Sequence, residues 1–152
     1  GQTLTELRAA LSVAETDLRG GLSPRVSPMA EIRELGTILQ RAGLALPVAD
    51  SLKIPTSYRD IFHLMRDLRA MGETNIMNAR AMGLTPRALF ERAQKIYAAE
   101  YSNSEGRLTC TFELVFLSGW APDASQPKPL KPGSVSKTLQ QALNEVKNSS
   151  NN

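Results

Sequence analysis

Hydrophobic residues recur three and four positions apart in five segments of the chain, which places them on one face of an α-helix in each segment. Thr3 followed by Glu6 forms a capping-box pattern, which is typical of a helix start. Ser27-Pro28 and Thr85-Pro86 each place a proline where the first helical residue is expected. The pattern therefore predicts helices over residues 2–19, 28–42, 58–71, 85–101 and 135–147.

Two further segments have the residues of β-strands. Leu44–Ile54 predicts a strand that Pro47 weakens in its first half. Leu108–Trp120 predicts a stronger strand, and beyond Glu113 it is apolar on both faces, as in the interior of a sheet covered on both sides. Two strands cannot form a stable sheet alone. We therefore expect that another chain supplies the missing strands or that an amino-terminal sheet has been left out.

The segment 56–75 predicts the best-defined helix of the chain. Ser57 is the expected N-cap, and Asp60 then falls at the third helical position, where an acidic residue is favoured. Gly72 stands where a left-handed residue ends a helix. The helix places four apolar residues in one stripe: Ile61, Leu64, Met65 and Leu68.

Candidate binding residues lie on and after this helix. Arg66 and Arg69 are three positions apart, so they can hold a carboxylate or phosphate together, or they can be solvated arginines paired with nearby acids. Glu73 and Asn75 follow the helix end and can cap it or bind a ligand. Trp120, at the end of a strand, can pack or line the mouth of a ligand site.

Composition excludes several classes of protein. The net charge of +3, with an isoelectric point near 9.2, comes from basic residues that are scattered among acids, so nucleic acid is not an expected partner. The one cysteine, Cys110, favours a reducing compartment and a buried thiol. No apolar run is long enough to span a membrane, and no leader is recognisable. The start at Gly1 favours a processed, cloned or proteolysed segment.

Known catalytic patterns are missing from the sequence. Gly20-Gly21 follows a predicted helix and not a strand, so it lacks the context of a phosphate-binding loop. His63 is the only histidine, which excludes a multi-histidine metal site. No carboxylate pair or nucleophile motif stands out. Composition and spacing alone therefore leave the function undetermined.

The chain nevertheless resembles the carboxy-terminal half of class I AdoMet-dependent methyltransferase-like proteins. It is similar to the mitochondrial complex I assembly factor 5 family and its alphaproteobacterial relatives, and more distantly to malonyl-carrier methyltransferases of biotin synthesis. The resemblance covers nearly the whole chain up to about Leu143. It rests on TLTELRAALSVAETDLRGGLSPRVSP (3–28), ELGTILQRAGL (34–44), YRDIFHLMRDLRAMGETN (58–75), GRLTCTFELVFLSGW (106–120) and SQPKPLKPGS (125–134).

The resemblance implies an α/β fragment, mostly helical, with two antiparallel strands. Leu44–Ile54 would be the sixth strand of a methyltransferase sheet and Leu108–Trp120 the seventh, lying between the fifth and the sixth. The Rossmann-like half that carries the AdoMet motifs would precede Gly1. Residues 1–122 would form the substrate-side part of the domain, with a helical insert over 56–101. Residues 123–134 would be a Pro/Lys-rich linker, and 135–152 a last helix and a disordered tail.

The functional expectations follow from this placement. The chain would be the substrate-side portion of an AdoMet-dependent enzyme, inactive alone and binding no S-adenosylmethionine, in a family linked to respiratory complex I assembly. The substrate would be a protein or a carrier-bound acid, and the chemistry methyl transfer or arginine hydroxylation. Arg66, Arg69, Glu73, Asn75 and Trp120 are the candidate substrate contacts. We expect a bacterial cytoplasmic protein that forms a homo-oligomer through the exposed edge of 108–120. The alternative is a stand-alone helical protein-protein interaction module.

Overall fold

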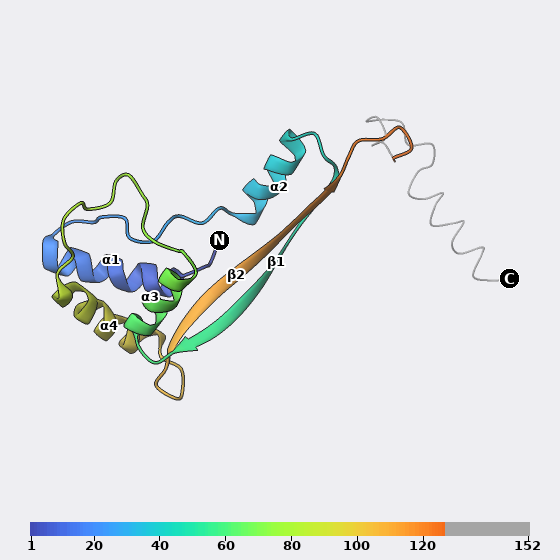
Figure 1. Ribbon diagram of the computed structural model, residues 1–152. Coiled ribbons are helices and arrows are strands. Elements are labelled where there is room, and N and C mark those ends of the chain that lie inside the picture. Colours follow the sequence, from blue (N-terminus) through green and yellow to red (C-terminus); the bar gives the residue numbers. More distant parts are fainter. Residues whose placement is uncertain (127–152) are drawn as a thin grey trace, which may run out of the picture. The chain divides into compact units, whose positions relative to one another are not determined.

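The computed structural model describes residues 1–126 of the chain. Residues 1–121 form one compact unit, which contains four helices and two strands (Figure 1). In chain order these are α1 (Thr5–Arg19), α2 (Ile32–Arg41), β1 (Ala45–Tyr58), α3 (Ile61–Ala70), α4 (Arg87–Tyr101) and β2 (Leu108–Trp120). The expectation of a mostly helical chain with two antiparallel strands is confirmed.

The two strands form an antiparallel sheet in which Tyr58 lies opposite Leu108 and Ala45 opposite Trp120. β2 has the predicted bounds, whereas β1 continues four residues beyond the predicted end at Ile54. Pro55 lies opposite Thr111. The Thr111 N–H and carbonyl point away from β1, where they bond to Glu6 and Leu4. Pro55 therefore stands in a non-hydrogen-bonded pair, where its missing N–H costs no ladder bond, and the strand passes through it.

The amino-terminal helix begins later than predicted and without the capping box. α1 starts at Thr5, after Leu4 in a left-handed conformation with φ 58°. Thr3 and Glu6 bond to β2 instead: the Glu113 N–H donates to the Thr3 hydroxyl over 2.9 Å, and the Thr111 N–H donates to the Glu6 carboxylate over 3.1 Å. Both side chains are thus used for tertiary contacts, which sequence spacing cannot reveal. Gly20 ends the helix at φ 66°, as predicted.

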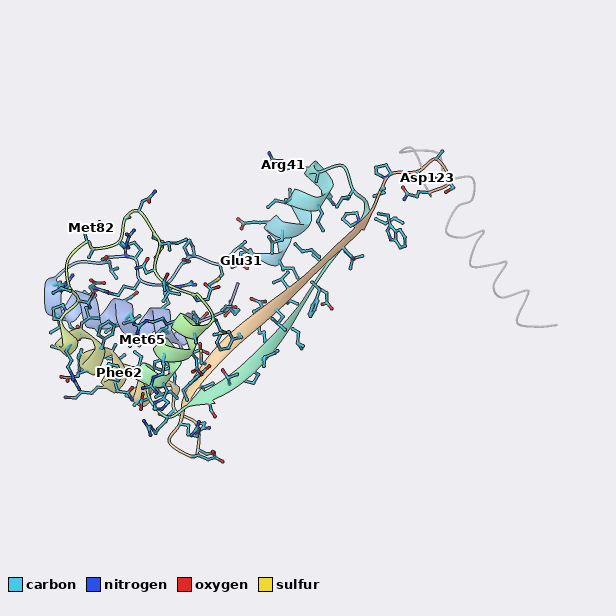
Figure 2. The ribbon with its side chains drawn as sticks, viewed as in Figure 1. Glu31, Arg41, Phe62, Met65, Met82 and Asp123 are labelled. Atoms are coloured by element: carbon cyan, nitrogen blue, oxygen red, sulfur yellow. The ribbon has the colours of Figure 1, made fainter. Side chains whose placement is uncertain are left out.

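The second predicted helix, 28–42, is shorter in the structure. α2 begins at Ile32, because Glu31 and Glu34 form a reciprocal capping box there, and Ser27-Pro28 lies in the preceding irregular segment. Figure 2 labels Glu31 before the helix and Arg41 at its end. α2 packs on the sheet, and its apolar residues Ile32, Leu35 and Leu39 are only partly buried.

The third helix also begins later than predicted. Asp60 is the N-cap, since its carboxylate accepts the His63 N–H over 2.9 Å, whereas the predicted cap Ser57 lies in β1 and accepts a hydrogen bond from Arg107. The hydrogen bonds from His63 and Arg59 outweigh partial burial and hold the pKa of Asp60 far below its usual range. The predicted helix 58–71 is therefore shorter in the structure, where α3 spans Ile61–Ala70. The first residues of the predicted helical insert 56–101 belong to β1, which ends at Tyr58.

The segment after α3 is irregular up to α4. Residues 73–82 contain no helix or strand in the structure. Met82 lies exposed on this segment (Figure 2). α4 then begins at Arg87 after Pro86, so the prediction of a helix from Thr85-Pro86 to Tyr101 is confirmed within two residues.

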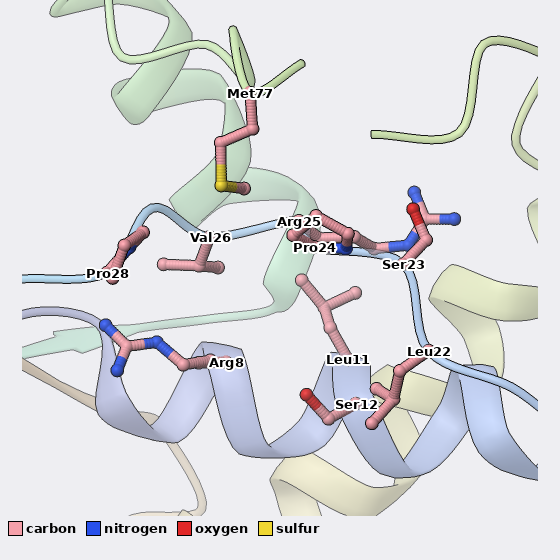
Figure 3. Close-up of a pocket in the computed structure, with 10 residues that line it drawn as sticks. All are labelled: Arg8, Leu11, Ser12, Leu22, Ser23, Pro24, Arg25, Val26, Pro28 and Met77. Carbon is pink, nitrogen blue, oxygen red and sulfur yellow. The ribbon is translucent and has the colours of Figure 1, made fainter. Parts of the chain in front are cut away.

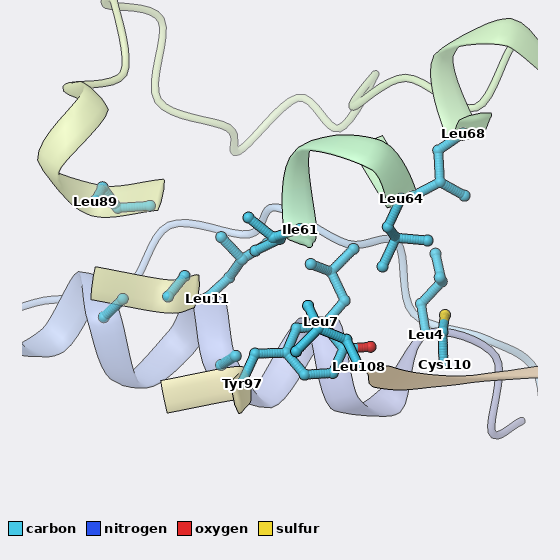
Figure 4. Packing of buried hydrophobic residues seen from close by; sticks show 13 residues of the cluster. Leu4, Leu7, Leu11, Ile61, Leu64, Leu68, Leu89, Tyr97, Leu108 and Cys110 are labelled. Carbon is cyan, nitrogen blue, oxygen red and sulfur yellow. The ribbon is translucent and has the colours of Figure 1, made fainter. Parts of the chain in front are cut away.

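The core lies between α1, α3, α4 and the first residues of β2 (Figure 4). Tyr97 is fully buried, and its hydroxyl donates to the Thr109 carbonyl over 2.8 Å. Cys110 is fully buried as predicted, and burial raises the pKa of its thiol to about 11. The buried apolar residues are Leu4, Leu7, Ala10, Leu11, Ala14, Ile61, Leu64, Leu68, Leu89, Ala93, Tyr97, Leu108 and Cys110.

The remainder of the sheet extends away from this core. From Leu114 onward most of β2 is exposed, so the prediction of an interior strand covered on both faces is not met by the described residues. α2 lies over the face that carries Pro47 and Ala49. The opposite face is apolar and open, with exposed Val48, Leu52, Leu114 and Phe116.

Residues beyond the sheet belong to a second unit that begins at Pro122. Residues 124–126 form a turn in which the Ser125 N–H donates to the Asp123 carboxylate over 2.9 Å. The predicted linker 123–134 is described only up to 126, and the predicted helix and tail of 135–152 lie outside the described residues.

Candidate functional site

The end of α3 forms one wall of a pocket that contains three of the five predicted site residues. Gly72, at φ 84°, ends α3 in a Schellman motif, with the Glu73 N–H donating to the Leu68 carbonyl over 2.8 Å. This turn carries the following residues back toward α1. The cavity has a volume of about 260 Å³ and is lined by Leu4, Leu7, Leu11, Arg25, Val26, Ser27, Met29, Met65, Leu68, Arg69, Glu73, Thr74, Asn75 and Phe90.

The pocket combines apolar walls with two free charges. Met65 and Phe90 contribute apolar surface from α3 and α4. Arg69 and Glu73 are exposed at the rim, and neither forms an ion pair with any residue of 1–126. A cation and a carboxylate are therefore available to a ligand at the same opening, with Asn75 beside them.

Asn75 has a structural role in addition to its place in the pocket. Its side-chain N–H donates to the Pro24 carbonyl over 2.8 Å, and its side-chain oxygen accepts the Met77 N–H over 3.2 Å. A second bond joins the same two loops, from the Ala81 N–H to the Ser23 hydroxyl over 2.9 Å. Asn75 thus fastens the segment after α3 to the segment after α1. Neither of its side-chain bonds caps α3, and ligand binding by Asn75 stays a prediction.

The other two predicted site residues lie elsewhere. Arg66 is exposed on α3, one turn before Arg69, and does not line the pocket. Trp120 is 68% exposed at the last position of β2, in the part of the sheet that extends away from the core. The structure therefore brings Arg69, Glu73 and Asn75 together and leaves Arg66 and Trp120 outside this pocket.

A buried ion pair holds Arg25 in the lining of the pocket, and sequence analysis missed it. Glu15 is 1% exposed, and its two carboxylate oxygens accept bonds of 3.0 and 2.8 Å from Nε and Nη2 of Arg25. Arg25 also donates to the Thr85 hydroxyl over 3.1 Å, which joins α1, the loop after it and the start of α4. The signal was present, because Glu15 follows Leu11 by four positions on the apolar face of α1.

The charge of Glu15 is stabilised where it lies. Burial alone would raise its pKa, but the hydrogen bonds and charge of Arg25, the Ser23 N–H and the charge of Arg19 together lower the pKa below the ordinary value of a glutamate. Glu15 is therefore a structural anion and not a proton donor at neutral pH.

The amino-terminal residues occupy part of the outer edge of β2. The Leu4 N–H donates to the Thr111 carbonyl over 2.9 Å, and Gln2 and Thr3 bond to Glu113. Gln2 and Thr3 contact Glu113, whereas Leu4, further along the segment, contacts the earlier strand residue Thr111. The segment therefore runs antiparallel to β2. Beyond Glu113, no residue of 1–126 pairs with the outer edge.

Catalytic groups are not evident in the described residues. Within 1–126 no group of three or more His, Cys, Asp and Glu side chains could hold a metal ion. Among the same residues, no helix is both long and apolar enough to cross a membrane. The pocket is suited to binding a polar or charged group beside an apolar one.

Comparison with known proteins identifies the class of protein to which this architecture is related. The chain is homologous to a part of two kinds of enzyme, arginine hydroxylases and malonyl-carrier methyltransferases. It is 42% identical over 136 residues to the mitochondrial arginine-hydroxylase NDUFAF5 of Dictyostelium discoideum, covering 89% of this chain and 31% of that protein. It is 38% identical to the human NDUFAF5 over 136 residues, which are 89% of this chain and 39% of the human protein.

The second kind of relative is more distant. The malonyl-[acyl-carrier protein] O-methyltransferase of Laribacter hongkongensis is 32% identical over 131 residues, covering 86% of this chain and 41% of that enzyme. The chain thus spans about a third to two fifths of the length of the curated relatives it matches. No protein-family model matches the chain, and no solved structure matches it.

Proposed function

We propose that this chain is the substrate-side portion of an AdoMet-dependent methyltransferase-like enzyme of the arginine-hydroxylase NDUFAF5 type, and that it is inactive alone. The higher identity to the NDUFAF5 proteins than to the malonyl-carrier methyltransferase supports this assignment. The observation that carries it is the outer edge of β2. The amino-terminal residues run antiparallel to this edge and bond to it up to Glu113, and the edge beyond Glu113 is unpaired among the described residues.

The proposal accounts for the incomplete sheet. On this view β1 and β2 are the sixth and seventh strands of a larger sheet. Residues that precede Gly1 in the whole protein would continue along β2 past Val115 and Leu117, as the fifth strand. Helices of the whole protein would also cover the open apolar face that carries Leu52 and Phe116.

The pocket at the end of α3 is the proposed substrate contact. A carboxylate such as Glu73 binds a guanidinium through paired, charge-assisted hydrogen bonds, as an arginine substrate requires. Arg69 would hold a carboxylate of the substrate segment, and Asn75 would keep the pocket wall in place. Arg66 lies on the outer surface of α3 and is proposed to contact a protein substrate beyond the pocket, whereas Trp120 has no role in this proposal.

S-adenosylmethionine is the cofactor proposed for the whole protein, and this chain alone is not expected to bind it. The sequence has no glycine-rich loop between a strand and a helix, which is the context that an AdoMet-binding motif requires. Calorimetric titration of the 152-residue chain with S-adenosylmethionine should give no heat of binding. A dissociation constant in the micromolar range would contradict the proposal.

A chimera tests the function directly. The part of the Dictyostelium discoideum NDUFAF5 that aligns with this chain is replaced by the chain, and both S-adenosylmethionine binding and arginine hydroxylation are measured. We expect the chimera to bind the cofactor and to retain hydroxylation, and the variant Glu73→Gln to lose hydroxylation while it still binds the cofactor. Asp67→Asn, an exposed acid on α3 outside the pocket, is the matched control.

The same chimera separates the alternative functions. Methylation of a malonylated carrier without hydroxylation would assign the chain to the methyltransferase branch. A chimera that fails to bind S-adenosylmethionine, together with a stable monomeric chain, would favour a stand-alone interaction module that recruits a partner by adding a strand to β2. The unpaired edge beyond Glu113 is the feature on which that alternative depends.

A further inference from the structure

A second pocket adjoins the first, and the two share Leu11, Arg25 and Val26 in their linings. Its volume is about 430 Å³, within the range of about 300–1,000 Å³ that is usual for small-molecule sites. In Figure 3, Met77 reaches toward Val26, Leu11 rises from α1 below Pro24, and Arg8 lies at the Pro28 end. The walls are thus mainly apolar, with charge supplied by arginine.

Only one of the two arginines in this pocket is neutralised. Arg25 is held by both oxygens of Glu15. Arg8 forms no ion pair with any carboxylate of residues 1–126. On the same helix, Glu15 pairs with Arg25 and Glu6 bonds to Thr111. The pocket therefore carries one uncompensated positive charge.

Arg8 also has an unused hydrogen-bond donor. Its Nη2 donates to the Ser27 carbonyl over 3.2 Å, but its Nε–H is buried and has no acceptor in the described part of the chain. No other buried side-chain nitrogen or oxygen within residues 1–126 lacks a partner. A buried donor without an acceptor is unfavourable, and a ligand acceptor that reaches the Arg8 guanidinium would relieve that cost.

We propose that this pocket binds an organic carboxylate with an apolar body, whose carboxylate pairs with Arg8. The planar guanidinium matches the two oxygens of a carboxylate, and a single free arginine suits a monoanion better than a doubly charged phosphate. The apolar body would lie against Leu11, Val26 and Met77. The pocket uses none of Arg69, Glu73 and Asn75, so its ligand can be tested separately from the reaction proposed above.

The test compares two probes of equal length. Octanoate carries the carboxylate, and octan-1-ol has the same apolar body without charge. The 152-residue chain carries five methionines, and methyl-labelled methionine NMR reports on them separately. We expect octanoate to shift the Met77 methyl signal and to bind roughly tenfold more tightly than octan-1-ol. Met65 and Met29 line the other pocket and Met82 lies exposed on the loop, so their signals should stay in place.

Variants assign the preference to Arg8. Arg8→Met should remove the preference, so that both probes bind with equal affinity, whereas Arg41→Met, at the exposed end of α2, should preserve it. Ser12→Phe fills the pocket and leaves Arg8 in place, so it should abolish binding of both probes even if Arg8→Met fails to fold. Equal affinity of the two probes for the unmodified chain, no binding of either, or shifts centred on Met65 would each overturn the proposal.

Discussion

At the scale of single residues, the Glu15–Arg25 pair is the most consequential feature of the structure. Glu15 is 1% exposed and the Arg25 side chain 13%, so both charges are largely removed from water and depend on each other. Breaking such a pair from one side leaves a buried charge without compensation. The pair also holds a wall that the two pockets share, because Arg25 lines both of them.

We expect Glu15→Gln to lower the free energy of unfolding by about 3 kcal/mol, because the amide keeps the shape but leaves the Arg25 charge uncompensated. Urea unfolding followed by circular dichroism measures it. Asp17→Asn is the matched control, since it breaks the Asp17–Arg92 pair whose side chains are 39% and 48% exposed, and it should cost about 0.5 kcal/mol. Equal losses in the two variants would show that the Glu15 pair behaves as a surface pair.

The same residue predicts a pH dependence with a definite sign. The pKa of Glu15 is lowered in the folded chain, so its stabilisation is complete above the unfolded value of about 4.3 and is lost as the pH falls through the folded value. The stability difference between the unmodified chain and Glu15→Gln should therefore shrink when the pH is lowered from neutral to below about 4. A difference that stays constant over this range would contradict the lowered pKa.

At the scale of elements, sequence predicted where helices and strands exist better than where they begin. Gly20 and Gly72 end α1 and α3 as expected, because a left-handed residue is a local requirement that glycine meets. The starts were wrong wherever a polar side chain was used by another element. Thr3 and Glu6 bond to β2 and do not cap α1, and Ser57 lies in the strand.

The end of α3 gives a prediction at this scale. Gly72 has φ 84° and no atom within 4 Å of an added Cβ, so Gly72→Ala should cost about 1 kcal/mol of stability through backbone strain alone. Gly21→Ala is the matched control, because Gly21 is equally open but its φ is not positive, and its stability should be unchanged or slightly higher. Thermal unfolding of both variants measures the two changes in stability. A similar loss of stability in each variant would contradict a left-handed conformation at Gly72.

At the scale of the whole molecule, the sequence predicted that the strand 108–120 lacks a neighbouring strand. Within residues 1–126, the structure limits the unpaired part of its outer edge to the residues beyond Glu113. The predicted exposed edge was all of 108–120, but the first half is already bonded to the residues around Thr3 and to Glu6. Only the part beyond Glu113 is open among the described residues. Sequence could not locate this boundary, because it arises from contacts between residues more than 100 positions apart.

The open stretch is also where we expect two copies of the isolated chain to associate. Backbone groups of Thr109, Thr111 and Glu113 face the outer edge, and the alternation of a strand places those of Val115 and Leu117 on the same side. An exposed edge with unpaired N–H and C=O groups beside apolar side chains is a template for pairing with a second copy.

Leu117→Pro tests this expectation, because it removes an outward N–H without removing a bond to β1. Light scattering on the isolated chain should show a dimer or larger species that Leu117→Pro converts to a monomer with unchanged circular dichroism. Leu84→Pro, in a loop where Leu84 is 98% exposed, is the control and should leave the association unchanged. A folded monomer at high concentration for the unmodified chain would refute association through this edge, because the unpaired part of β2 would then be stable in water.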